Sequence, residues 1–228
     1  MGPAQRPSDA PRALEQVRRR TRTTKPRDQR RREILQAALD LFRDRGFEAT
    51  AVQAIAERAD VAAGTVYLYF SSKDAILLAL AEEFEAGLVD RFAATSEQVL
   101  AEEDASGEIV GYEEVVDRLI DAFVRYSLDN RAVAEVLANQ LGRVAGARDG
   151  AILGGALTTL LADVIRTGQR LGYVHTSDPD MTAYLLDVAT MTAIGNALAF
   201  DDEVTLNRVV RQAKELFVKA LAPHAGKP

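Results

Sequence analysis

The sequence predicts an all-α protein in which a small N-terminal helix-turn-helix unit is followed by a larger helical body. Apolar residues recur every three or four positions along most of the chain, as in Ile34, Ala38 and Phe42, and this spacing places them on one face of a helix. No segment alternates polar and apolar residues in the manner of a half-buried strand. Glycine, proline and asparagine separate the periodic segments, which predicts short connections between helices.

The first two helices are predicted by their end signals. A periodic pattern begins near Asp28 and stops at Gly46, since glycine favours the left-handed conformation that ends a helix. Thr50 and Gln53 have the spacing of a capping box, in which a hydroxyl and an amide satisfy the first backbone N–H groups of a helix. A second, short helix is therefore expected directly after Thr50.

The remaining helices follow in order along the chain. A turn at Asp60 leads to a third helix over about residues 62–69, and Ser71-Ser72 is expected to cap a fourth helix that begins at Lys73. Residues 104–112 are expected to form a loop. Further helices are predicted over about residues 113–128, 131–145, 148–171, 179–199 and 203–222.

Charge is distributed unevenly along the chain. The whole sequence has a net charge of −6, yet residues 1–45 carry 13 Lys and Arg against 6 Asp and Glu. A basic N-terminal end on an acidic chain is typical of contact with nucleic acid or with an anionic membrane surface. The alternative is a solvated basic tail without a partner. Residues 1–26 hold four of the seven prolines and no apolar period, which predicts a disordered basic arm.

Composition excludes several classes of function. The chain has no cysteine and only two histidines, which excludes disulfides, thiolate zinc sites and a cysteine nucleophile, and we expect neither a metal nor another cofactor. No G-x-S-x-G motif is present, and an enzyme is not expected. No secretory segment or apolar run of membrane-spanning length occurs, which favours a cytoplasmic protein without a membrane partner. The expected division is a basic arm (1–26), a helix-turn-helix domain (27–72), an effector-binding and dimerisation domain (73–223) and a tail (224–228).

The third predicted helix has two unlike faces. Val66 and Phe70 have the spacing of residues that pack against the preceding helices. The small residues at its start allow the backbone to approach base edges, and the hydroxyls of Thr65 and Tyr67 can bind phosphates or bases. This arrangement is typical of a DNA-recognition helix. Taken alone, however, the tyrosines could equally be amphipathic core residues.

The segment Thr50–Lys73 resembles the DNA-binding signature of the TetR family of transcriptional regulators. The specific part is Gly64–Phe70, with the sequence GTVYLYF, followed by Lys73. Asp60 and Ala62 depart from the family pattern, which more often has glycine at the end of the second helix and Ser or Thr as the cap of the third. The resemblance implies phosphate contacts from Thr50, Tyr69 and Lys73, and approach to bases by Ala63, Gly64, Thr65 and Tyr67.

The same resemblance implies partners. It implies a homodimer that binds a pseudo-palindromic operator in double-stranded DNA, and a ligand-responsive regulator, in the usual case a repressor, that a small molecule releases from that operator. The basic residues before and within the first helix, including Arg27, Arg30 and Arg31, are expected to lie along the DNA backbone or in an adjacent minor groove.

The helical body offers candidate residues for a ligand and for a dimer. The larger or polar side chains that could line a cavity are Phe123, Tyr126, Asn139, Arg143, Tyr184 and Met191. Asn139, Gln140 and Arg143 have a spacing that could anchor an acid or phosphate group, and the same spacing also fits a solvent-exposed face. Small and apolar residues on the last two helices predict a four-helix dimer interface, with Ala189, Ala193, Ala197, Val210 and Phe217 as its residues. The alternative function is a helical protein-interaction module with a basic tail.

Overall fold

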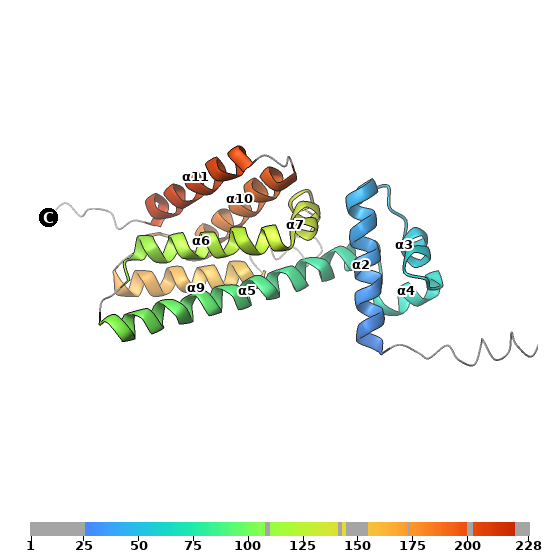
Figure 1. The fold of residues 1–228 in the computed structure, drawn as a ribbon, viewed down its shortest axis with the longest axis horizontal. Coiled ribbons are helices and arrows are strands. Elements are labelled where there is room, and N and C mark those ends of the chain that lie inside the picture. The colour runs from blue at the N-terminus through green and yellow to red at the C-terminus, as the bar shows by residue number, and fades with distance from the viewer. Residues whose placement is uncertain are drawn as a thin grey trace, which may run out of the picture.

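A computed structural model describes residues 26–107, 110–140, 143–144, 155–172, 174–199 and 203–221. Over these residues the chain is helical without a strand, which confirms the predicted fold class (Figure 1). The predicted arm over residues 1–25 and the predicted tail lie outside the described residues. The helices are α2 (Arg27–Arg45), α3 (Val52–Arg58), α4 (Ala63–Tyr69), α5 (Lys73–Ser106), α6 (Tyr112–Asp129), α7 (Arg131–Ala138), α9 (Ala156–Leu171), α10 (Pro179–Ala199) and α11 (Glu203–Leu221).

Helices α2, α3 and α4 form a small N-terminal unit at one end of the molecule (Figure 1). Its core holds Ile34 of α2, Ile55 of α3 and Val66 of α4, all of which are fully buried. The first turns of α5 complete this core through Ile76 and Leu77, which are also fully buried. The short helices α3 and α4 are therefore held by packing, because helices of this length have little stability of their own.

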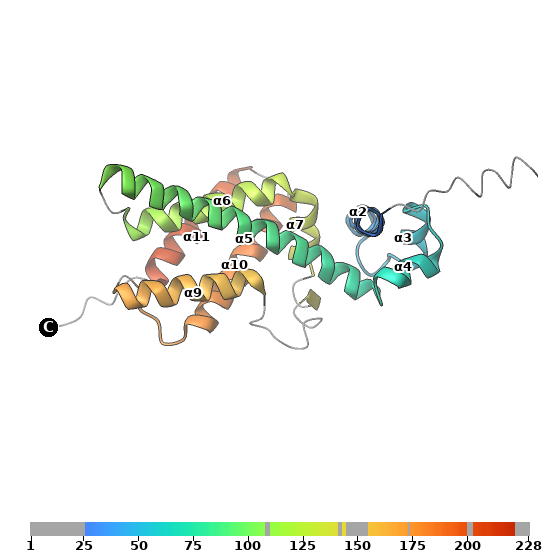
Figure 2. The ribbon, with the colours of Figure 1, turned by 90° about the horizontal axis from the view of Figure 1, so that it is seen from below.

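The remaining helices form the body, in which α5 runs away from the small unit alongside α6 (Figure 2). Helix α10 contacts α9, α7 and α11, and α11 covers α6. Gly195 allows α10 to approach α7 closely, since a Cβ atom at Gly195 would lie 2.3 Å from the Cβ of Ala138. None of the helices in the described ranges combines the length and the apolar character that crossing a lipid bilayer requires.

Three predicted helix boundaries differ in the structure. Helix α7 ends at Ala138 instead of near residue 145, because the backbone N–H of Gln140 bonds to the carbonyl of Leu137 at 2.9 Å and tightens the chain into a turn. The helix expected from residue 148 begins at Ala156 within the described residues. Helix α5 extends to Ser106, through the start of the predicted loop.

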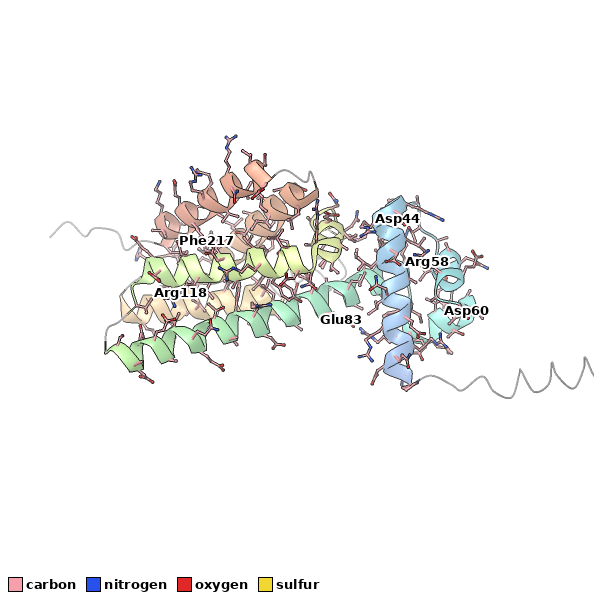
Figure 3. All side chains as sticks on the ribbon, in the orientation of Figure 1. Asp44, Arg58, Asp60, Glu83, Arg118 and Phe217 are labelled. Atoms are coloured by element: carbon pink, nitrogen blue, oxygen red, sulfur yellow. The ribbon has the colours of Figure 1, made fainter. Side chains whose placement is uncertain are left out.

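The turn between α3 and α4 depends on Asp60, which Figure 3 labels at the outer end of the small unit. Its φ angle of 52° is the only positive one at a non-glycine residue in the described part of the chain. The backbone N–H of the next residue, Val61, bonds to the carbonyl of Ala56 at 2.9 Å and ends α3. Aspartate tolerates the left-handed conformation better than most residues, and the expectation that the turn survives without glycine is confirmed.

We expect Asp60→Ala to destabilise the protein and Asp60→Gly to preserve or raise its stability. The left-handed conformation costs alanine about 1 kcal/mol, whereas glycine adopts it freely. Denaturant unfolding of both variants measures the difference, with Asp44→Ala as a control at another exposed acidic residue of the same unit. Equal unfolding free energies for the alanine and glycine variants would contradict this account of the turn.

Candidate nucleic-acid interface and ligand cavity

The outer face of α4 carries large exposed side chains on a helix that is fixed from inside. Tyr67 is 56% exposed and Leu68 is 77% exposed, whereas the intervening face rests on fully buried Val66. Gly64 lies at the exposed start of α4, and a Cβ atom there would meet nothing within 4 Å. This face can enter a groove without unfolding or repacking of the small unit.

Other residues predicted to approach bases are less accessible. Ala63 and Thr65 are half-buried, and Ala63 packs against the core. Leu68 was not among the predicted site residues, although it is the most exposed of the large apolar side chains described. Leu68 therefore adds an exposed apolar side chain beside Tyr67 on the outer face of α4.

Thr50 does not form the predicted capping box, and that prediction is wrong. Its side chain is buried at 2% exposure, and its hydroxyl donates to the carbonyls of Gly46 (2.8 Å) and Leu41 (3.3 Å). The residue that caps α3 is Ala51, without a side-chain hydrogen bond. Thr50 therefore ties the end of α2 to the start of α3, and its buried hydroxyl does not support the predicted phosphate contact.

Lys73 opens α5 as predicted, with Ser72 as its cap through a 3.1 Å hydrogen bond from the backbone N–H of Ala75. The Lys73 ammonium also serves the fold. It donates to the carbonyls of Phe47 (2.6 Å) and Glu48 (3.3 Å) and lies 4.3 Å from the centre of the Phe47 ring. An ammonium has three donors, which leaves one for a phosphate.

The arginines at the start of α2 lie against the end of α4. The Arg27 guanidinium is 6.0 Å from the centre of the Tyr69 ring, and that of Arg31 is 5.5 Å from the centre of the Phe70 ring. Arg31 also pairs with Glu83, which Figure 3 labels where α5 passes α2. Such contacts orient the basic side chains beside α4.

The remaining arginine of the predicted set has a local partner. Arg30 pairs with Glu33 at 2.7 Å, one turn further along α2. Arg27 makes no ion pair with any residue in the described ranges. Arg27 is therefore the best placed of the three predicted arginines to meet a phosphate.

The body contains a cavity of about 460 Å³, partly open to solvent, between α5, α6, α9, α10 and α11. This volume lies within the range of small-molecule sites. Of the predicted ligand residues, Phe123 lines it. Phe217, which was predicted at the dimer interface, lines this cavity instead, from the side of α11 that faces α6 (Figure 3).

The other five predicted ligand residues do not line this cavity. Met191 belongs to the core, and Tyr184 is half-buried on α10 away from the lining. The ring of Tyr126 packs on Phe84 with centroids 5.1 Å apart, and burial raises the pKa of the Tyr126 hydroxyl. Asn139 donates to the carbonyl of Glu135 at 3.0 Å beside a small space of about 140 Å³ between α2 and α7.

Arg143 joins the body to the N-terminal unit. Its guanidinium donates to Asp74 at the start of α5 (3.1 Å) and to Glu48 in the loop after α2. It also lies 4.7 Å from the centre of the Phe47 ring. The hydrogen bond to Asp74 is the main cause that raises the pKa of Arg143. The guanidinium that was expected to bind an acidic ligand group therefore binds acidic side chains of the chain itself.

The outer faces of α10 and α11 carry exposed apolar side chains. Leu185 of α10 is 59% exposed and Leu216 of α11 is 51% exposed, and Ala189 of α10 is exposed as well. Ala193 and Val210 are half-buried, but Ala197 is buried within the subunit at 3% exposure, which does not support its predicted place in an interface. Met181 and Val204 extend the exposed set.

Metal chemistry finds no support in the described part of the chain. No three His, Asp or Glu side chains there cluster so as to hold a metal ion. The features that stand out are therefore the exposed face of α4, the cavity in the body, and the apolar surface of α10 and α11.

Comparison with solved structures shows the shared fold. FadR of Thermus thermophilus, a TetR family transcriptional repressor solved in complex with lauroyl-CoA, matches with a TM-score of 0.59 and 21% identity, over 87% of this chain and 98% of that chain. The fatty acid degradation regulator FadR of Bacillus halodurans matches with a TM-score of 0.59 and 21% identity, over 82% and 94%.

Sequence comparison agrees over both parts of the chain. The HTH-type transcriptional repressor KstR of Rhodococcus jostii (strain RHA1) is 55% identical over 58 residues, 25% of this chain and 27% of KstR, so the match spans about a quarter of that relative. A family model described as bacterial regulatory proteins, tetR family, matches residues 34–80, and one for the tetracyclin repressor-like C-terminal domain matches residues 112–221. The two models span more than half of the sequence, and the chain belongs to the TetR family of bacterial regulatory proteins.

Proposed function

We propose that the protein is a ligand-responsive, sequence-specific DNA-binding transcriptional regulator that acts as a repressor and is released from its operator by a small molecule. The observation that carries this proposal is the outer face of α4, where Tyr67 and Leu68 are exposed beside fully buried Val66. A protein reads base edges in a major groove with the exposed side chains of a firmly held helix. The family is one of regulators and is not an enzyme class.

The DNA contacts divide into two kinds. Tyr67 and Leu68 would meet base edges, where a leucine side chain suits the methyl group of thymine and a phenol suits a base acceptor. Gly64 would let the backbone at the start of α4 approach the groove. Arg27 and the remaining donor of Lys73 would bind phosphates, which positions the helix without reading sequence.

A second copy of the chain completes the proposed operator site. We assign the exposed apolar surface of α10 and α11, centred on Leu185, Ala189 and Leu216, to a homodimer interface. A two-fold dimer presents two α4 helices to two half-sites, so the operator would be pseudo-palindromic. Because the DNA lies in the cytoplasm of bacteria, the regulator would act there.

The cavity in the body is the proposed effector site. It is lined mainly by aliphatic and aromatic side chains, including Phe123 and Phe217, which suits a small molecule with an apolar body. A ligand changes DNA affinity only if it prefers one arrangement of the dimer over another. The direct contacts of α7 and Arg143 with the N-terminal unit provide the physical connection.

Two substitutions separate base reading from phosphate binding. Tyr67→Ala should weaken binding to an operator selected by the wild-type protein from random duplexes by roughly tenfold, because a specific base contact contributes about 1–3 kcal/mol, with little change on random DNA. Arg27→Gln should weaken both and lower the log–log salt slope by about 0.9 for each lost phosphate contact. Gel-shift titrations at several salt concentrations measure both effects.

The control for these variants is Arg125→Gln, which removes an exposed arginine from α6, far from α4. Its affinity for the operator should equal that of the wild type. If Tyr67→Ala binds the operator as tightly as the wild type does, or loses the same affinity on random DNA, the assignment of α4 to base reading is wrong.

Leu185→Glu and Leu216→Glu should each weaken the dimer at least roughly tenfold, because a carboxylate would be buried in an apolar contact. Sedimentation equilibrium at micromolar concentration measures the association. Leu128→Glu is the matched control, since Leu128 is similarly exposed but lies on α6. If neither Leu185→Glu nor Leu216→Glu changes dimerisation, the assignment of this surface to the dimer interface is wrong.

A further inference from the structure

The lining of the cavity in the body indicates which class of ligand it would bind. This inference about the ligand rests on the proposed role of the cavity as the effector site. Its walls follow α6 from Gly111 to Phe123 and α9 from Leu157 to Gly168. At a rise of 1.5 Å per residue these stretches extend for about 18 Å and about 16 Å. The cavity is therefore elongated along both helices, and it suits a long, narrow apolar molecule.

Four polar side chains occur among the described residues that line the cavity. Two are the carboxylates Glu103 and Asp187, and two are the hydroxyls Thr167 and Thr190. No Lys, Arg or His belongs to the described lining. The fixed charges that a ligand would meet on these walls are therefore negative.

Each carboxylate is held in place by a donor from a neighbouring element. A carboxylate oxygen of Glu103 accepts from the backbone N–H of Val110 at 2.7 Å, and one of Asp187 accepts from the hydroxyl of Thr158 at 2.7 Å. An ionised carboxylate can accept about four hydrogen bonds. Both groups are thus oriented by the fold, and Glu103 retains capacity to accept from a ligand.

The two carboxylates lie toward opposite ends of the body. Glu103 is beside the segment that leads into α6, and Asp187 is bonded to Thr158 in the first turn of α9. Helix α9 begins beside Glu85 of α5, whose carboxylate accepts from the backbone N–H of Ala156 at 3.2 Å. Glu85 and Glu103 are about 27 Å apart along α5, and Figure 2 shows α6 and α9 beginning at opposite ends of the body.

We infer that the effector is an elongated apolar molecule whose polar group is a hydrogen-bond donor, a hydroxyl or an ammonium, and not a free carboxylate or phosphate. An anionic head group beside Glu103 or Asp187 would meet a like charge on walls whose described residues carry no cation, which is unfavourable. A donor head group would instead bond to Asp187 or Glu103. The apolar remainder of the ligand would fill the space between α6 and α9.

The test compares three probes that share a chain and differ only in the head group: dodecan-1-ol, dodecylammonium and dodecanoate. Calorimetric titration of the full chain, below the aggregation concentration of each probe, measures affinity. We expect the alcohol or the ammonium to bind at least roughly tenfold more tightly than the carboxylate. Asp187→Asn together with Glu103→Gln should reduce the preference of ammonium over carboxylate to about threefold or less. Leu119 lines the cavity, and Leu119→Trp should fill the cavity and abolish binding of the preferred probe.

The outcomes separate this inference from the proposed function. Equal or tighter binding of dodecanoate, or no binding of any of the three probes, would overturn the inferred ligand class. The gel shift of the selected operator is then read with the preferred probe present. Tight binding of a donor probe that leaves operator affinity unchanged would support the ligand class and count against release by a ligand.

Discussion

The packing of the first turns of α5 beneath α2 is the contact on which the rest of the structure depends. Ile76 and Leu77 are fully buried in the same core as Ile34, and further along the same 34-residue helix Leu88 is fully buried as well. One continuous hydrophobic cluster therefore reaches from α4 into the body. A displacement of α5 by a ligand would have to move or strain the N-terminal unit, because close-packed interiors transmit displacement.

A polar and aromatic cluster reinforces this connection at the loop after α2. The ring of Phe47 is buried, and its centre lies 4.3 Å from the ammonium of Lys73 and 4.7 Å from the guanidinium of Arg143. Arg143 also pairs with Glu48 and Asp74. Exposed ion pairs individually contribute little, but this group fixes an arginine of the body on both the loop and the start of α5. Through Arg143, which follows α7, the cluster connects the body directly to the N-terminal unit.

The local features of the fold could be predicted from the sequence, and the features that depend on tertiary packing could not. The turn at Asp60 and the cap at Ser72 are set by neighbouring residues, and the structure has both. The hydroxyl of Thr50 instead finds carbonyl partners on α2 that local spacing does not reveal. The apolar residues of α11 are evident in the sequence, but their division between a cavity face at Phe217 and an exposed face at Leu216 depends on where α6 lies.

Native-state hydrogen exchange tests most directly the claim that the N-terminal unit and the body are one packed structure. It measures the free energy of opening at each amide. The account predicts that amides in the buried parts of α2, around Ile34 and Leu41, open with the same free energy as those around Ile76 and Leu88 of α5, to within about 1 kcal/mol. Opening of the α2 amides at a free energy several kcal/mol lower, with α5 still protected, would contradict it.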